Sequence, residues 1–440
     1  TGGWGFISSQ LTLAGPIGTE QATLLVWVRR TYADLCLKLS NDKDIIDNTL
    51  YFYDLNAKVN YRISDNDRIY IAGYFGKDNF STRFAGMDFG NSTVTARWNH
   101  IFSPKLFSNF TLLGSFYNYR LNTDLSEQIK EEWKSKMNDY GFKADFSYHP
   151  NPSDNIKFGY NATYHNFIPG EGGGIGEESI VGKITFPKEY ALEHAAYVAN
   201  EMTIAEKLKL KYGLRYSIFQ NIANGEELKY MNNYQVEYTK KYDKGDFYKT
   251  QSQLEPRLGA LYLINDENSV KASYSRTAQY IQLASNSAAG SPLDVWFQSS
   301  QNVKPQLCDQ YALGYFRNFS NNEYEVSAEI YYKNMKDVVD FKDHAQLLGN
   351  KDIESELRFG KGYSYGLEVM LRKNTGRLNG WISYTFAKSR RQIDEINNGK
   401  WYRSPYDKPH NISIVGNFEL SSKWTLSANW VYASGTPITY

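Results

Sequence analysis

Apolar and polar residues alternate along many short segments of this chain. In the segment 54–63, Leu55, Val59 and Tyr61 occupy every second position, and Lys58 and Asn60 lie between them. Successive side chains of a β-strand point to opposite faces, so this pattern predicts a strand with one apolar and one polar face. The segments 156–165 and 208–217 repeat it. Such strands border an apolar medium on one side and water on the other.

About eighteen segments fit this description, each of roughly the length that crosses a bilayer at a tilt. We predict strands at 6–14, 22–31, 51–63, 68–77, 92–102, 107–119, 139–149, 155–165, 191–202, 207–218, 254–264, 269–278, 309–318, 323–334, 363–374, 379–388, 410–420 and 423–433.

The connections between these segments alternate in length. Tight polar turns are expected at 64–67, 150–154, 203–206, 265–268, 320–322, 375–378 and 421–422. Longer connections are expected at 32–50, 78–91, 120–138, 166–190, 219–253, 279–308, 335–362 and 389–409. Bacterial outer-membrane barrels have short periplasmic turns and long extracellular loops. The sequence therefore predicts an all-β fold, a transmembrane antiparallel β-barrel.

Composition agrees with a barrel wall. Aromatic residues make up 16% of the chain, yet the mean hydropathy is −0.56. The longest apolar run, 24–28, is far too short for a spanning helix, and a chain without such helices spans a bilayer only by closing its strands into a ring. The formal net charge of +1 provides no basic surface for nucleic acid.

One long connection has helical rather than alternating spacing. Leu125, Ile129, Trp133 and Met137 fall on one stripe of a helix over 124–138. We predict a short helix there, on the extracellular rim.

The chain offers no pattern for a metal or cofactor. Cys36 and Cys308 lie far apart, and no pair of its six histidines has metal-ligand spacing. The glycine-rich stretch 170–178 joins two predicted strands, whereas a phosphate loop requires a following helix. Calcium binding by its three carboxylates is an alternative, but a plain loop is the stronger interpretation. We expect no cofactor, no metal and no enzymatic activity.

Several motifs occur together in an order that resembles one family. They are 2–9 (GGWGFISS), 28–32 (VRRTY), 53–58 (YDLNAK), 98–102 (WNHIF), 212–216 (YGLRY), 255–257 (EPR), 365–368 (YGLE), 406–411 (YDKPHN) and 434–439 (SGTPIT). In this order they resemble the TonB-dependent outer-membrane transporters, in the form typical of Bacteroidota.

The resemblance implies a barrel of twenty-two strands, of which the segments above fit as the second to the nineteenth. Residues 1–440 would then form a single, partial barrel domain. The first strand, the last three strands and the N-terminal plug domain would lie outside this sequence. The resemblance also implies energy coupling through TonB and the plug, and a surface lipoprotein as an extracellular lid.

Candidate substrate contacts come from two places. Polar side chains of the strands are expected to face the lumen, at Lys58, Arg62, Arg97, Lys143, Asp145, Lys157, His165, Lys209, Lys211, Arg215, Glu368 and Arg372. The loop around 276–297 places aromatic and polar groups at the extracellular mouth, where an imported molecule would first bind. Its candidates are Arg276, Gln279, Tyr280, Gln282, Asp294, Trp296 and Phe297. For the aromatic residues, anchoring the barrel at the lipid interface is the alternative role.

The function expected from this pattern is active import of a bulky nutrient, such as a siderophore, vitamin, oligosaccharide or peptide, into the periplasm. Two alternatives stay open. A passive porin would have sixteen or eighteen strands and no plug, and a surface-assembly barrel would serve as a platform for other proteins.

Overall fold

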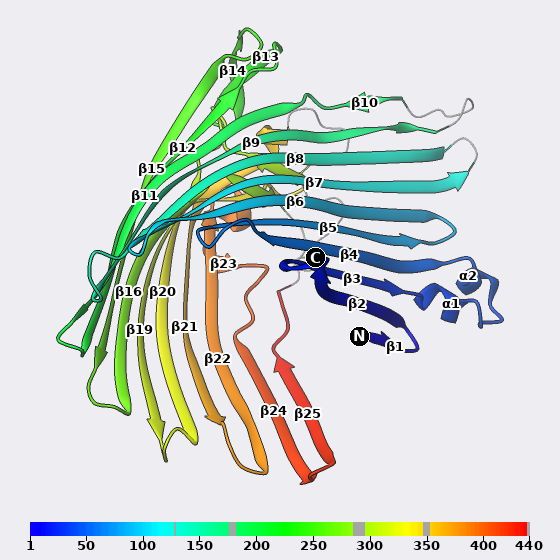
Figure 1. Ribbon diagram of the computed structural model, residues 1–440. Helices are drawn as coiled ribbons and strands as arrows, with labels where there is room; N and C mark the ends of the chain where they lie inside the picture. Colours follow the sequence, from blue (N-terminus) through cyan, green and yellow to red (C-terminus); the bar gives the residue numbers. More distant parts are fainter. Residues whose placement is uncertain (127–128, 176–181, 285–294, 346–352, 438–440) are drawn as a thin grey trace.

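The protein is built on one large curved antiparallel sheet that forms the wall of a barrel (Figure 1). The computed structural model describes residues 1–126, 129–175, 182–284, 295–345 and 353–437. Within these ranges the sheet has 21 strands. Three of them, β1, β10 and β23, contain only two or three residues, and the other eighteen contain ten or more. The eighteen strands predicted from alternation are these eighteen.

The short strands are β1 (Gly2–Trp4), β10 (Ile184–Thr185) and β23 (Tyr402–Arg403). The long strands are β2 (Ser8–Ile17), β3 (Thr19–Thr31), β4 (Thr49–Arg62), β5 (Asp67–Ser81), β6 (Ala85–Ser103), β7 (Leu106–Ser126), β8 (Ile129–Tyr148), β9 (Asp154–Gly174), β11 (Glu189–Ile204), β12 (Leu208–Ile222), β15 (Phe247–Leu263), β16 (Asn268–Gln279), β19 (Gln306–Phe319), β20 (Tyr324–Phe341), β21 (Leu357–Lys373), β22 (Leu378–Ile393), β24 (His410–Ser421) and β25 (Trp424–Ala433).

Each long strand pairs with the long strands that precede and follow it in sequence. The sheet thus runs as an up-and-down meander from β2 to β25. No pairing joins β25 to β1 or β2 within the described residues, and Figure 1 shows these strands as the two edges of the wall.

The outer face is apolar, as the alternation predicts. Leu258 on β15, Leu313 on β19 and Ile330 on β20 are 56%, 49% and 53% exposed. Leu313 is directly paired with Ile330, so these side chains form a continuous band. In water this exposure would be costly, whereas lipid tails cover such a band without cost.

Short turns end the strands on one rim, as expected. β4 and β5, β8 and β9, β11 and β12, and β21 and β22 are joined by at most five residues. At the opposite rim the expectation is only partly right. Most of 78–91 and of the described part of 120–138 is paired strand, because β5 to β8 continue well past the predicted segments. β5 pairs with β6 as far as Ser81, and β7 pairs with β8 as far as Ser126.

The helix predicted over 124–138 is wrong, since the described residues of this range, 124–126 and 129–138, belong to β7 and β8. Pairing with the neighbouring strands overrides the local helical spacing. Trp133 illustrates the reason: its indole N–H donates to the hydroxyl of Tyr119 at 3.0 Å, and its ring lies against Gly170 and Gly172 of β9. The ring also meets Phe186 edge to face, with centroids 5.4 Å apart.

The remaining elements are short and belong to the longer connections. They are α1 (Ala33–Leu37), α2 (Lys43–Ile46), the 3₁₀ turns η1 (Ile353–Glu356) and η2 (Ile396–Gly399), and the hairpins β13 (Glu227–Asn232) with β14 (Gln235–Lys241) and β17 (Ile281–Ala284) with β18 (Val295–Gln298). Among the described residues, no helix is long and apolar enough to cross a membrane.

Candidate functional site

Charged side chains on the inner face of the wall form a connected network around Arg215 of β12. Its Nη1 donates to Oδ1 of Asn161 at 2.7 Å, and its Nε lies 3.4 Å from Oε1 of Glu255. Glu193 of β11 is at the edge of the network, 4.0 Å from Nη2. Glu255 is only 4% exposed, so the guanidinium is needed as its counter-ion.

A second part of the network crosses three strands. The hydroxyl of Tyr197 on β11 donates to Asp145 on β8, across the intervening strand β9. Gly159 allows this crossing, because a Cβ at this position would lie 2.9 Å from the Tyr197 ring. Lys143 completes the group, with its ammonium 3.0 Å from Asp145.

His165 connects the network to the extracellular side. The imidazole is buried, with Nδ1 2.8 Å from Oδ1 of Asp139 and Nε2 3.9 Å from Oε2 of Glu193. The structure thus brings together four of the predicted lumen-facing residues, Lys143, Asp145, His165 and Arg215. Each of the four contacts polar side chains on nearby strands, so together these residues form a polar lining on the inner face of the wall.

Above this lining, the described parts of the connection between β16 and β19, residues 280–284 and 295–305, fold into the interior. The ring of Tyr280 stacks on Phe219 of β12, with centroids 5.1 Å apart and planes 6° apart. Its hydroxyl is 2.9 Å from the hydroxyl of Ser217. Asn221 donates its amide N–H to the carbonyl of Ser299 at 2.8 Å. The segment is therefore fixed against the inner face of β12 by both stacking and buried hydrogen bonds.

A small apolar core fixes the same segment on the opposite side. Phe297 of β18 packs in it with four residues that are at most 7% exposed, namely Val303, Val339, Phe341 and Leu357. Val339 and Phe341 come from the end of β20 and Leu357 from the start of β21, whereas Val303 belongs to the same connection as Phe297. Contacts of β17 with β20 and of β18 with β9 show that the segment reaches across the mouth.

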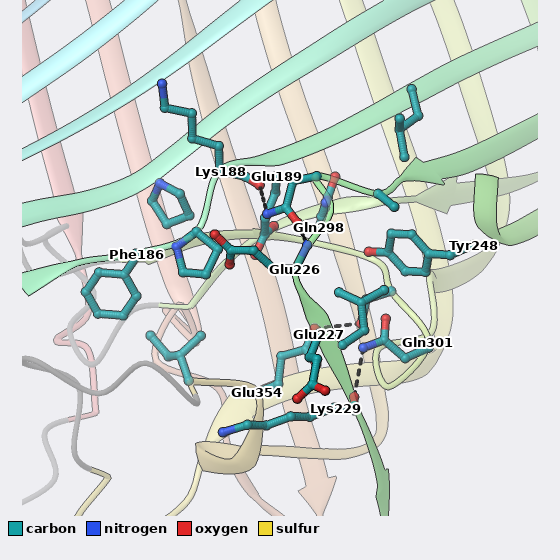
Figure 2. Close-up of a pocket in the computed structure, with 18 of the residues that line it drawn as sticks. Phe186, Lys188, Glu189, Glu226, Glu227, Lys229, Tyr248, Gln298, Gln301 and Glu354 are labelled. Carbon is teal, nitrogen blue, oxygen red and sulfur yellow. Dashed lines mark hydrogen bonds between the residues drawn. The ribbon is translucent and has the colours of Figure 1, made fainter. Parts of the chain in front are cut away.

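A cavity of about 300 Å³ lies where this segment meets the extracellular ends of the wall (Figure 2). Glu189 begins β11 and lines the cavity together with Tyr248 of β15, Gln298 of β18 and Glu354 of η1. The ionisable lining residues are Lys188, Glu189, Glu226, Glu227, Lys229, Tyr248 and Glu354. With four glutamates and two lysines, the lining is formally negative when these groups are ionised.

The turn 299–303 forms a preorganised side of the cavity. The hydroxyl of Ser300 donates to Oε1 of Glu354 at 2.6 Å, and the amide of Asn302 donates to Oε2 at 2.5 Å. Gln301 donates to the carbonyl of Lys229 at 2.9 Å, and the N–H of Met231 donates to the side chain of Asn302 at 2.9 Å. Three separate connections of the chain are tied together at this turn.

The cavity alters the acid–base behaviour of its lining. Burial raises the pKa of the Glu189 carboxyl to about 8, the nearby Glu354 adds to this, and a hydrogen bond from Gln298 acts in the opposite direction. Burial together with the same two carboxylates raises the pKa of the Tyr248 hydroxyl. Glu189 directly precedes Tyr190, whose ring stacks on Tyr164. Such aromatic residues are typical of the membrane interface, so we place the carboxyl of Glu189 outside the lipid band.

The predicted contacts of the mouth loop occupy different environments. Arg276 donates to both oxygens of Asp309, at 2.7 and 3.0 Å, on the outer face that carries Tyr274 and Tyr311. Gln279 is exposed and donates to the carbonyl of Ile281 at 2.9 Å.

The others belong to the inward-folded segment. Tyr280 and Phe297 are buried as described above, and Gln282 is buried with its amide 3.3 Å from the carbonyl of Lys304. Trp296 is half-buried in β18, and Asp294 lies outside the described residues. None of the six described residues lines the cavity, so their contact with a substrate stays a prediction.

The residues that line the cavity were missed from the sequence. Gln298 follows Phe297 directly but is not among the residues predicted from the sequence. Glu189 and Glu354 come from two other connections, and no local pattern indicates that they meet. The only sequence feature that points to Glu189 as a site residue is its carboxylate close to the start of a predicted strand. The described residues contain no group of His, Cys, Asp or Glu side chains that could hold a metal ion.

Solved structures with the same fold include several receptors and a transporter. The ferric preacinetobactin receptor BauA from Acinetobacter baumannii shares 13% identity over 97% of this chain and 67% of its own, with a TM-score of 0.67. The copper transporter OprC shares 12% over 96% and 66%, with a TM-score of 0.70. The ferric-catecholate import receptor Fiu from E. coli K12 shares 12% over 96% and 68%, with a TM-score of 0.64. This chain thus spans about two thirds of their length.

No curated protein sequence matches the chain. The family model described as TonB dependent receptor-like, beta-barrel matches residues 32–439. This match covers the strands from β4 to β25, with their outer apolar band and inner polar lining. The chain therefore belongs to the TonB-dependent receptor β-barrel family, whose place is the bacterial outer membrane.

Proposed function

We propose that the protein imports a bulky nutrient across the outer membrane by TonB-dependent active transport. The observation that carries the proposal is the family match, which extends over nearly the whole wall. A wide barrel of this family has room for a plug, which closes the pore until it is remodelled. The partners of this chain would then be outer-membrane lipid, a plug domain and TonB.

The mouth supports a receptor better than an open pore. The inward-folded residues 280–284 and 295–304 are fixed by the Tyr280 stack and by the Phe297 core, and the second stretch encloses a cavity together with η1 and β13. A preorganised polar cavity binds ligands with a smaller entropic cost than flexible loops do. A porin gains nothing from such a site.

The cargo class stays open between siderophore, vitamin, oligosaccharide and peptide. Two of the similar structures are named as receptors for ferric chelates and the third as a copper transporter. These names make a metal chelate the first cargo to test. A surface lipoprotein over the mouth stays a prediction.

Uptake measurements on cells test the proposal. Cells with and without the gene are given labelled candidates from the four classes, with the proton gradient intact or collapsed by a protonophore. We expect one class to enter only when the gene is present and the gradient is intact. Uptake that continues without the gradient would favour a porin, and unchanged uptake in cells lacking the gene would favour a platform for other proteins.

A further inference from the structure

The cavity contains hydrogen-bond acceptors that have no donor. Gln298 is 3% exposed, its amide bonds to Glu189, and its Oε1 has no partner among the described residues. Oε1 of Gln301 is also buried and without a donor in the described part of the chain. Both residues line the cavity. A buried acceptor left without a donor costs free energy, so this site is suited to a ligand that brings N–H or O–H groups.

The charge of the lining narrows the choice of ligand. Four glutamates face two lysines around the cavity, which favours a cation. Glu354 is already bonded by Ser300 and Asn302. Glu189 is held by the neutral amide of Gln298, and no ion pair of Glu189 is found among the described residues.

We propose that this cavity binds a protonated primary amine of the transported molecule, with Glu189 as counter-ion and Oε1 of Gln298 as acceptor. An ammonium group carries three donors, and Glu189, Gln298 and Gln301 offer one acceptor each. A volume of about 300 Å³ accommodates a side chain of lysine type rather than an entire bulky cargo. The cavity is thus a subsite that recognises one arm of the cargo, and this inference rests on the proposed import function.

The site has a defined pH dependence. Glu189 is mostly protonated below its pKa of about 8 and ionised above it, while a ligand ammonium keeps its proton to about pH 10. Binding should therefore strengthen from pH 6.5 to pH 9. The other ionisable groups that line the cavity with Glu189 are Lys188 just before β11, Glu226, Glu227 and Lys229 of β13 and its preceding turn, Tyr248 of β15 and Glu354 of η1.

Ligand-observed NMR with the full-length protein in detergent tests the assignment. The probes are Nα-acetyl-lysine amide, its Nε-acetylated form and Nα-acetyl-arginine amide. We expect the lysine probe to bind about tenfold more tightly than the acetylated probe, the difference that one charge-assisted hydrogen bond supplies. Glu189→Gln should remove this difference, and the control Glu237→Gln, on the exposed strand β14, should leave it unchanged.

A second variant guards against loss of structure. Gln298→Met keeps the size of the side chain, removes the acceptor and should weaken the lysine probe by a smaller factor. Heat-modifiable migration on gels checks that each barrel is folded.

Equal binding of the lysine and acetylated probes to the folded wild-type protein would overturn the proposal. Arginine binding as tight as lysine binding would overturn the assignment to a primary amine. Cellular uptake is measured separately from probe binding. The two experiments can therefore reject the amine site while supporting gradient-dependent import, or reject import while supporting the amine site.

Discussion

The two ends of the strands differ in how their structure is encoded. At the periplasmic end, the strands stop at short polar turns as soon as the apolar band ends. At the extracellular end, β5 to β8 continue as paired strands above the membrane. There, Lys77 lies 3.2 Å from Asp88, and Arg120 lies 4.0 Å from Asp88 and 3.2 Å from Glu132. Contact with lipid determines where the strands stop at the periplasmic end. At the extracellular end, cross-strand charge pairs stabilise the strands beyond the membrane.

This difference explains in which parts of the strands the alternation pattern no longer predicts structure. Alternation arises only while one face of a strand meets lipid and the other meets water. Above the bilayer both faces are wet, so Lys77, Asp78 and Asn79 follow one another as three polar residues within β5. Nothing in such a stretch separates a strand from a loop.

The largest expected effect tests the lipid-facing half of the comparison. On β16, Ala272 lies on the outer face opposite Leu313, and Ser273 points into the lumen. Ala272→Arg should cost about 2–4 kcal/mol of unfolding free energy, because an arginine near the bilayer midplane is poorly solvated. Ser273→Arg should cost far less. Urea unfolding of the protein in lipid vesicles, followed by tryptophan fluorescence, measures both, and equal losses would mean that the inner and outer faces are assigned wrongly.

All eighteen long strands and most short turns could be predicted because each depends on a local pattern. The helix over 124–138 failed because Trp133 is held by Tyr119 and by β9, a partner some forty residues away in sequence. The cavity could not be predicted from the sequence for the same reason. Glu189, Gln298 and Glu354 come from three separate parts of the chain, and only the folded wall brings them together.

The second-largest expected effect tests the extracellular mouth of the barrel. Asn221→Ala removes a buried hydrogen bond to the carbonyl of Ser299, which should cost about 1–3 kcal/mol. Because the bond fixes the inward-folded residues around Ser299, the loss should appear locally, as faster cleavage by added protease within residues 295–304. Asn232→Ala, at an exposed position of β13, is the matched control. Unchanged cleavage in the Asn221 variant would show that the Phe297 core alone fixes the segment.

A smaller effect comes from the acid–base chemistry of the cavity. The pKa of Glu189 is raised in the folded protein, so the native state holds a proton that the unfolded chain releases between about pH 4.3 and pH 8. Its contribution to stability therefore falls as the pH rises through this window. Glu189→Gln removes this loss and should gain about 1 kcal/mol over the wild type between pH 5 and pH 9, discounted because the side chain is half-buried. Thermal unfolding at the two pH values measures the gain, and a constant difference would argue against a raised pKa.

The smallest effect compares one turn from each rim. Thr82 ends the β5–β6 hairpin outside the cell, where its hydroxyl accepts the N–H of Ala85 at 3.2 Å. Ser64 plays the equivalent part in the periplasmic β4–β5 turn and accepts the N–H of Asn66 at 3.1 Å. Each substitution by alanine should cost about 0.5–1 kcal/mol, the net value of one exposed turn hydrogen bond. Hydrogen exchange of the flanking amides compares the two turns. If the extracellular extension is as ordered as the periplasmic rim, the two losses are equal, whereas a loss at Ser64 alone would mean that the charge pairs of β5 to β8, and not their turn, hold the extension together.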